Sequence, residues 1–298
     1  MESLVKIGSR GSKLAFIQAS LVQNKLESVG VKSEIVIIKT SGDIIVDKPL
    51  YDIGGKALFV KELEESLLEN KIDIAVHSMK DIPAQIPHEL VVPACLEREN
   101  ICDVLISKNS CDINSLPIGA KIGTCAVRRI AILKALRPDL TIFPLRGNID
   151  TRLRKFDTEH FDAIILAAAG LNRLGIWRDY FHIINPEIMI PAVGQGAIGI
   201  EARRNDANIL NILSKINHEE TFRNLQLERG FVEKIDGSCH TPLGCYSKVV
   251  GDKIHAYFML AKDDLSAIYR TQNIYDKSES LYECGSLAAK ELLRKAEE

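Results

Sequence analysis

Residues 72–83 have the sequence Ile-Asp-Ile-Ala-Val-His-Ser-Met-Lys-Asp-Ile-Pro, in which a short apolar run passes directly into polar and charged side chains. Short apolar runs that are rich in β-branched residues are typical of strands buried inside a parallel sheet. We expect the strand to end at Val76, so that Lys80 and Asp81 follow its carboxyl end. The segment therefore predicts an α/β sheet with charged groups along one edge.

The segments before this strand predict a β-α-β-α-β alternation, which indicates a mainly parallel sheet with helices on both faces. The expected elements are a strand at 5–8, a helix from about Ser12 with the apolar stripe Leu14, Ile17 and Leu21, a strand at 34–38 that is apolar enough for burial on both faces, and a helix at 57–70 with Phe59, Leu63 and Leu67 one turn apart.

A second α/β unit follows Pro93, and the pattern changes again from His218. We expect a strand at 197–202 to return to the first sheet and to make the first domain discontinuous. The other expected elements are strands at 103–107, 121–123, 141–145 and 162–169, helices at 126–136 and from Asn148, a helix with the stripe Phe222, Leu225, Val232 and Ile235, antiparallel strands at 248–261 and 267–274, and a helix at 280–298.

These patterns predict three domains of the α/β and α+β classes. Domain 1 comprises residues 1–96 and 197–216, domain 2 comprises residues 97–196, and domain 3 comprises residues 217–298 and contains the antiparallel sheet. A chain of 298 residues is long for a single core, which also favours several domains.

The composition narrows the class of protein. Apolar residues make up 46% of the chain and charged residues 26%, as is ordinary for a soluble globular protein. The formal net charge of −2 favours neither nucleic acid nor an anionic membrane as a partner. We find no signal segment after Met1 and no apolar run near the ~20 residues of a membrane span. Seven cysteines without CxxC spacing predict reduced thiols in the cytoplasm and no metal site.

Basic residues follow the expected strands at their carboxyl ends. Ligands of open α/β sheets bind at this edge, and arginine suits paired contacts with carboxylate or phosphate. Helix starts at 124–126 and 147–148 add backbone N–H groups that favour anions. We interpret the pattern as a cleft between two lobes that binds a ligand with several negative charges. The basic residues are Arg10, Lys80, Arg128, Arg129, Arg146, Arg152, Arg154 and Arg173.

Asp81 and His77 each have a functional and a structural interpretation. A carboxylate at the mouth of an anion-binding cleft can stabilise a developing cation or transfer a proton. Asp81 can equally cap the turn before Pro83 or pair with Lys80. We interpret His77 as a structural histidine that is satisfied by the backbone.

Cys239 differs from the six other cysteines because it lies in the run 237–244, which is rich in glycine and proline. A thiol in such a loop is suited to be an attachment point or a nucleophile. The adjacent His240 does not make a Cys–His pair, because neighbouring residues in a chain usually point apart.

Several blocks of sequence occur together in one order. They are Gly-Ser-Arg-Gly-Ser at 8–12, Val-His-Ser-Met-Lys-Asp-Ile-Pro at 76–83, Gly-Thr-Cys-Ala-Val-Arg-Arg at 123–129, Leu-Arg-Gly-Asn at 145–148 with Thr151 and Arg152 just beyond, Ala-Gly-Leu-Asn-Arg-Leu-Gly at 169–175, Pro-Ala-Val-Gly-Gln-Gly-Ala-Ile-Gly-Ile-Glu at 191–201, and Glu228 with Arg229 followed by Gly-Ser-Cys at 237–239 and Pro-Leu-Gly at 242–244. In combination these blocks closely resemble the hydroxymethylbilane synthase family, also called porphobilinogen deaminase, over nearly the whole chain. One block alone would be only suggestive, whereas the ordered set is highly specific.

The resemblance implies two doubly wound lobes similar to two-lobed anion-binding proteins, and a smaller C-terminal α+β domain that carries the cysteine loop. It implies a transferase of tetrapyrrole and haem biosynthesis that condenses four porphobilinogen molecules head to tail with release of ammonia. Hydrolysis then releases the linear tetrapyrrole hydroxymethylbilane. The implied primer is a dipyrromethane cofactor held on Cys239 by a thioether, and the family favours a monomer.

The resemblance also implies roles for single residues. Asp81 matches the carboxylate that hydrogen-bonds pyrrole N–H groups, stabilises positive charge and assists proton transfer. The residues implied to contact acetate and propionate groups or to line the cleft are Arg10, Ser12, Lys80, Thr124, Arg128, Arg129, Arg146, Arg152, Arg173, Lys56 and Gln195.

This chain departs from the family pattern at Cys125 and Ala126, where many relatives carry serines. We expect one hydroxyl contact to a cofactor carboxylate to be missing, so that backbone N–H groups bind it instead.

Two other functions fit parts of the pattern. A two-lobed carboxylate- or anion-binding protein would use the same strand-end arginines without catalysis, but it would need neither Asp81 nor the cysteine loop. A thiol-dependent hydrolase would use Cys239 as a transient nucleophile, but the chain offers no clear histidine base. We therefore favour the transferase.

Overall fold

The computed structural model describes residues 4–40, 60–238 and 240–297. The chain divides into two compact units, Met1–Glu99 with Gly196–Arg223 and Asn100–Gln195 with Asn224–Glu298. Each unit is built from two separate stretches of the chain. The separation of a third domain at residue 217 stays a prediction.

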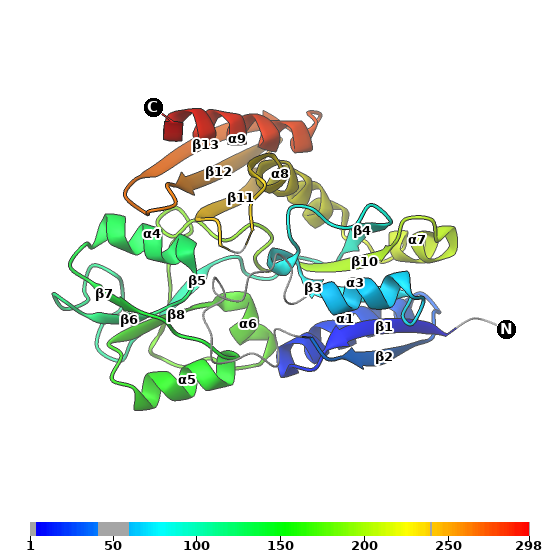
Figure 1. Cartoon of the computed structure of the whole chain (residues 1–298), viewed down its shortest axis with the longest axis horizontal. Helices are drawn as coiled ribbons and strands as arrows, with labels where there is room; N and C mark the ends of the chain where they lie inside the picture. Colours follow the sequence, from blue (N-terminus) through cyan, green and yellow to red (C-terminus); the bar gives the residue numbers. More distant parts are fainter. Residues whose placement is uncertain (1–3, 41–59, 239, 298) are drawn as a thin grey trace. The chain divides into compact units, whose positions relative to one another are not determined.

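The first unit contains a five-stranded sheet with the order β2-β1-β3-β10-β4 (Figure 1). The predicted return of a late strand to the first sheet is confirmed, because β10 lies between β3 and β4. The strands are β1 (Val5–Arg10), β2 (Ser33–Ile38), β3 (Ile74–Ser78), β4 (Leu90–Cys95) and β10 (Ile198–Arg203).

This sheet is mixed but mainly parallel, as predicted, because four of its five described strands run in one direction and β10 runs in the other. β1 is parallel to β2 and β3, whereas β10 is antiparallel to β3 and β4. The chain enters β10 at the carboxyl end of β3, where Ile198 lies opposite Ser78, so β10 has to run the other way.

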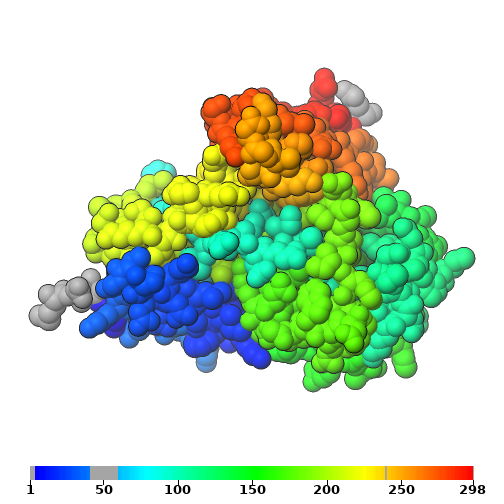
Figure 2. All heavy atoms as spheres, turned by 180° about the vertical axis from the view of Figure 1, so that it is seen from behind, coloured from blue at the N-terminus to red at the C-terminus, as the bar shows by residue number. Residues whose placement is uncertain are grey.

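Helices cover both faces of the sheet, as the alternation predicts. α1 (Lys13–Ser28) and α7 (Ala207–Ser214) share one apolar core with the sheet, and Figure 2 shows the blue segment of α1 and the yellow segment of α7 side by side. α3 (Lys61–Leu68) packs on the other face through Leu63 and Leu67, which are fully buried.

The buried face of α1 differs from the predicted stripe. Ala15, Ala19, Val22 and Leu26 face the core, whereas Leu21 is 40% exposed. The separation of packed elements depends on the side chains between them, so the alanines allow α1 to lie close to the sheet. A stripe chosen by side-chain size alone is therefore rotated away from the true contact face.

The prediction that the strand at 34–38 is buried on both faces is also wrong. In the described part of the sheet β2 is the edge strand and pairs with β1, and Ile37 is 47% exposed. A short apolar run does not by itself distinguish an edge strand from a central one.

The second unit contains a similar five-stranded sheet with the order β7-β6-β8-β5-β9. β6 is parallel to β7 and β8, and β5 is antiparallel to β8 and β9. Apolar residues of α4 pack on one face, and those of α5 and α6 pack on the other. The elements are β5 (Asp103–Ile106), β6 (Lys121–Gly123), β7 (Thr141–Phe143), β8 (Ala163–Ala167), β9 (Phe181–Ile183), α4 (Val127–Leu136), α5 (Ile149–Thr158) and α6 (Ala168–Arg173).

The C-terminal segment forms a three-stranded antiparallel sheet that is preceded and followed in the chain by a helix, and the sequence predicts an antiparallel sheet here. The single strand expected at 248–261 is two strands, because the chain turns at Gly251 with φ +62°, a conformation that favours glycine. The elements are α8 (Glu219–Ile235), β11 (Leu243–Val250), β12 (Lys253–Ala261), β13 (Ile268–Asp276) and α9 (Leu281–Glu297).

Helices α8 and α9 cross where each presents a glycine. A Cβ atom on Gly230 would clash with the backbone of Tyr282, and a Cβ on Gly285 would clash with the backbone of Leu227. Backbone atoms cannot move aside as a side chain can, so this crossing requires glycine on both helices.

We expect Gly230→Ala to lower the free energy of unfolding by about 1–3 kcal/mol through overpacking. The sign is opposite to the gain of about 1 kcal/mol that alanine normally brings inside a helix. Urea unfolding of this variant beside Lys290→Ala, at an exposed position of α9, measures the effect. Greater stability of Gly230→Ala than of wild type would show that the helices have room to separate.

Among the residues described, no helix combines the length and the hydrophobicity needed to span a lipid bilayer.

Candidate active site

A small cavity of about 120 Å³ in the first unit brings together four of the predicted site residues, Arg10, Ser12, Lys80 and Asp81. β1 and β3 are parallel neighbours, so their carboxyl ends lie at the same edge of the sheet. Arg10 ends β1, while Lys80 and Asp81 lie in the short 3₁₀ turn Met79–Asp81 directly after β3. The strand-end argument therefore places these residues correctly with respect to one another.

Local contacts hold the walls of this cavity. The hydroxyl of Ser12 caps α1 by accepting a hydrogen bond from the backbone N–H of Ala15 at 3.2 Å. Gln18 of α1 donates from Nε2 to Oγ of Ser78 at 2.8 Å and so ties the helix to the end of β3. The first turn of α1, with its positive dipole end, therefore lies beside the cationic side chains.

His77 also lines the cavity, and its partner is not the predicted one. Nε2 of His77 lies 2.9 Å from Oε2 of Glu201 on β10, and both side chains are buried. The expectation of a backbone partner is wrong for this nitrogen, because a carboxylate from the returning strand reaches it. A residue pattern along β3 cannot reveal a partner that comes from 124 residues later in the chain.

In the second unit three predicted residues follow neighbouring parallel strands. Thr124 follows β6, Arg146 follows β7, and Arg173 ends the short helix after β8. Arg152 lies in the first turn of α5, where its Nε donates to the carbonyl oxygen of Gly147 at 2.7 Å. These positions agree with the strand-end argument, and contact of these residues with a ligand stays a prediction.

Arg128 and Arg129 are buried side chains and are not exposed at the surface of a cleft. Both bind the carboxylate of Asp103. Nη2 of Arg128 donates to Oδ2 of Asp103 at 2.8 Å, and Nη2 of Arg129 donates to Oδ1 at 2.7 Å. Gln195 adds a third donor, from Nε2 to Oδ1 at 2.9 Å. All four residues are at least 95% buried.

This arrangement explains how a carboxylate can be fully buried at the start of an apolar strand. Burial alone would raise the pKa of Asp103, but the charges of Arg128 and Arg129 outweigh it and hold the pKa well below its usual range. We did not include Asp103 among the candidate residues. Its signal is an acidic residue that opens a strand whose other residues are all apolar, since a buried acid requires a cation or several donors.

The direct ligand contacts predicted for Arg128, Arg129 and Gln195 stay predictions. One end of each guanidinium donates to Asp103 and the other to a backbone carbonyl, from Arg128 to Ile190 and from Arg129 to Ile165. Nε of Arg129 is buried without a hydrogen-bond partner in the described residues. The network therefore sets the position of both arginines before any ligand binds.

Cys125 and Ala126 change the start of α4. Ala126 occupies the cap position without a side-chain hydrogen bond, and its own N–H donates to Oγ1 of Thr124 at 3.3 Å. α5 differs, because Asn148 caps it by accepting from the N–H of Thr151 at 2.9 Å. The start of α4 thus lacks the hydroxyl cap that a serine would provide.

Two predicted site residues, Cys239 and Lys56, lie outside the described residues. Beside position 239, the N–H of Ser238 donates to Oγ1 of Thr241, and the N–H of Thr241 donates to the carbonyl of Ser238, both at 3.0 Å.

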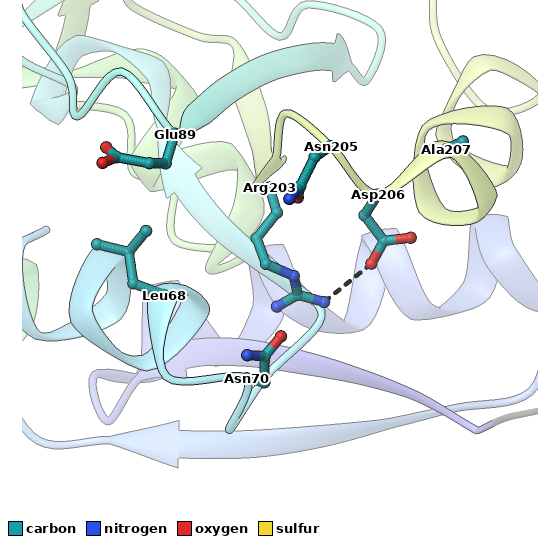
Figure 3. Close-up of a pocket in the computed structure, with 7 residues that line it drawn as sticks. All are labelled: Leu68, Asn70, Glu89, Arg203, Asn205, Asp206 and Ala207. Carbon is teal, nitrogen blue, oxygen red and sulfur yellow. Dashed lines mark hydrogen bonds and ion pairs between the residues drawn. The ribbon is translucent and has the colours of Figure 1, made fainter.

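A second cavity of about 500 Å³ in the first unit is lined by residues that sequence reasoning did not select (Figure 3). Arg203 dominates it, but its guanidinium donates to Asp206 at 2.9 Å and to the carbonyls of Leu67 and Ile72. Arg203 therefore joins α3, the segment just before β3 and the start of α7, and we assign it a structural role.

Comparison with known proteins decides the family. Residues 5–211 match the family model "Porphobilinogen deaminase, dipyromethane cofactor binding domain", and residues 222–294 match "Porphobilinogen deaminase, C-terminal domain". The chain belongs to the porphobilinogen deaminase family. The recognition made from the ordered sequence blocks is thereby confirmed, together with the dipyrromethane cofactor domain.

Curated porphobilinogen deaminases resemble the chain over almost its full length. The protein of Rickettsia prowazekii is 47% identical, over 98% of this chain and 99% of its own length. That of Lawsonia intracellularis is 44% identical, over 97% and 94% respectively. A solved nutrient binding protein from Burkholderia cenocepacia bound to methionine is 14% identical with a TM-score of 0.45, over 73% of this chain and 93% of that protein.

Family membership supports the transferase and not the noncatalytic anion-binding protein.

Proposed function

We propose that this protein is a hydroxymethylbilane synthase, which condenses four porphobilinogen molecules head to tail with loss of ammonia and then releases the linear tetrapyrrole by hydrolysis. The observation that carries the proposal is the cavity in which Asp81 lies with Arg10, Lys80 and Ser12, in a chain of this family. One carboxylate among cations suits a ligand that combines carboxylates with N–H groups that become positively charged during reaction.

Asp81 is the proposed catalytic residue. Its carboxylate accepts hydrogen bonds from pyrrole N–H groups and stabilises positive charge that develops on the ring during condensation. It also takes up or returns the proton exchanged at each step, which requires direct hydrogen-bond contact with the reacting group. The 3₁₀ turn that carries Asp81 is anchored just before β10, because the N–H of Met79 donates to the carbonyl of Ala197 at 3.0 Å.

The cationic residues are proposed to bind the acetate and propionate groups of the pyrroles. Arg10 and Lys80 do so in the first unit, with the start of α1 as an additional anion site. Arg146, Arg152 and Arg173 do so in the second unit, since arginine matches a carboxylate with two parallel N–H donors. Each added pyrrole brings two carboxylates, so several separate cations are required.

The cationic side chains named above fit the carboxylates of the dipyrromethane group that the family binds. When attached, this group supplies the free pyrrole carbon onto which the first porphobilinogen is added. Cys239 is proposed to hold it through a thioether, since sulfur is a strong nucleophile and a thioether is not cleaved by water. The buried Asp103 network is proposed to orient Arg128 and Arg129 toward the same carboxylates.

The intact mass of the purified protein tests the attachment. We expect wild type to carry an increment equal to two linked pyrroles, and Cys239→Ser to lack both the increment and activity. Cys111→Ser is the matched control, because Cys111 is an exposed cysteine elsewhere in the chain, and it should keep both. An active wild-type enzyme of unmodified mass would refute the covalent attachment. A monomeric state and a cytoplasmic location also stay predictions of the sequence.

A further inference from the structure

A buried histidine–carboxyl pair reaches the wall of the cavity that holds Asp81. His77 and Glu201 come from antiparallel neighbours, with His77 opposite Gly199 and Glu201 opposite Ala75. Their side chains are 3% and 1% exposed, and Nε2 of His77 lies 2.9 Å from Oε2 of Glu201. His77 also lines the cavity, so this pair joins the cavity wall to the protein interior.

A second carboxyl group, that of Glu64, lies on α3, the helix that packs over Ala75, which is the β3 residue opposite Glu201. Glu64 belongs to α3, which packs against β3 and β10, and the residue is 8% exposed. Burial, with a smaller contribution from Glu201, raises the pKa of Glu64 to about 7, while His77 acts in the opposite direction. Glu64 therefore binds its proton in the pH range in which enzymes work.

Burial and a neighbouring carboxyl group explain why Glu64 keeps a proton. An ionised Glu64 would be shielded from water and would face the carboxyl group of Glu201, and both effects disfavour its charged form. Oε1 of Glu201 is already buried without a hydrogen-bond partner among the described residues. Ionisation of Glu64 therefore adds one negative charge to this buried group of side chains.

The titratable groups that act on Glu64 come from three elements. They are His77 from β3, Glu201 from β10 and Glu65 from α3 itself. β1 ends in Arg10, which lines the cavity together with His77, Lys80 and Asp81. An added negative charge at Glu64 thus lies behind a cavity whose cations are proposed to bind carboxylates.

We propose that Glu64, His77 and Glu201 form a buried positioning cluster that holds the end of β3 and couples anion binding beside Asp81 to the protonation of Glu64. This inference rests on the proposed function, because the anion is the carboxylate-bearing substrate of the same cavity. None of the three is a catalytic residue in this proposal, since they act through the residues that line the cavity.

The sign of the effect follows from the direction of the shift. Glu64 binds its proton more tightly in the folded state than in the unfolded chain, whose ordinary value is 4.5. The stability it contributes is present below that value and is lost as pH rises through about 7. Substrate binding weakens over the upper part of the same range, because the ionised Glu64 opposes the anion.

The test compares Glu64→Gln with wild type and with Glu69→Gln, an exposed glutamate just past the end of α3. Glutamine has nearly the shape of the protonated acid but cannot ionise. From pH 6 to 8.5, we expect the KM for porphobilinogen of wild type and Glu69→Gln to rise by about three- to tenfold more than that of Glu64→Gln, as one nearby charge at intermediate dielectric would produce. Any effect of substrate ionisation on KM is the same for all three proteins, so it does not affect this comparison.

A second readout does not depend on activity. The free energy of unfolding of wild type and Glu69→Gln should fall between pH 5 and 8, and that of Glu64→Gln should fall less. If Glu64→Gln does not fold, the imidazole NMR signals of His77 in wild type replace it and should show an inflection near pH 7, when Glu64 ionises. Parallel pH profiles in wild type and Glu64→Gln, or no such inflection, would overturn the proposal. Failure of wild type to consume porphobilinogen at any pH would instead overturn the proposed function.

Discussion

Replacement of Asp81 by asparagine is expected to lower kcat by about 10²–10⁴-fold, the range that positioned acid–base groups contribute. Asparagine keeps the size of the side chain but removes the negative charge and the ability to accept a proton. Asp81 is half-buried beside Arg10 and Lys80, so its charge is not needed to balance a fully buried cation. The free energy of unfolding should therefore change by less than about 1 kcal/mol.

The measurement is the rate of ammonia release at saturating porphobilinogen, with intact mass as a check that the primer is attached. Asp263→Asn, at an exposed turn between β12 and β13, is the control and should retain full activity. The role assigned to Asp81 fails if the Asp81→Asn enzyme carries the primer and releases ammonia at the normal rate. Loss of the fold in Asp81→Asn would instead assign the carboxylate to structure.

Replacement of Asp103 by alanine is expected to cost about 3–5 kcal/mol of unfolding free energy, as is typical when one partner of a buried ion pair is removed. The loss leaves the guanidinium groups of Arg128 and Arg129 buried without their shared carboxylate. Gln195 loses an acceptor at the same time. The effect on stability should far exceed that of any surface charge in this unit.

Asp139→Asn provides the matched control, because Asp139 forms an Asp–Arg pair at the surface with Arg137. Water screens that pair, so we expect a far smaller effect in urea unfolding. The depressed pKa of Asp103 makes its contribution present above the ordinary carboxyl value and lost as pH falls below it, so the difference between wild type and Asp103→Ala should shrink in acid. Equal losses for both variants at neutral pH would contradict the account of the buried network.

Strand ends were predictable from sequence because they depend on local pattern. An apolar run followed by polar residues identifies where a strand stops, and parallel neighbours then bring those ends to one edge. Arg10, Lys80 and Asp81 meet in one cavity for this reason. The family could also be recognised from sequence, because its ordered blocks include the residues that the chemistry requires.

Partners far apart in the chain could not be predicted in this way. His77 meets Glu201 because β10 returns antiparallel beside β3, and the residue pattern along β3 contains no information about that strand. The contact face of α1 depends on close packing over alanines, which a stripe of large side chains does not reveal.

The sequence by itself determined the α/β class, the family and the edge of the sheet at which Asp81 and the cations lie, because these follow from periodicity and from residue chemistry. Only the tertiary structure decided that Arg128 and Arg129 share the buried Asp103, and that His77 lies beside Glu201. The physical reason is desolvation, since a charged side chain removed from water requires a partner, and that partner is chosen by proximity in space.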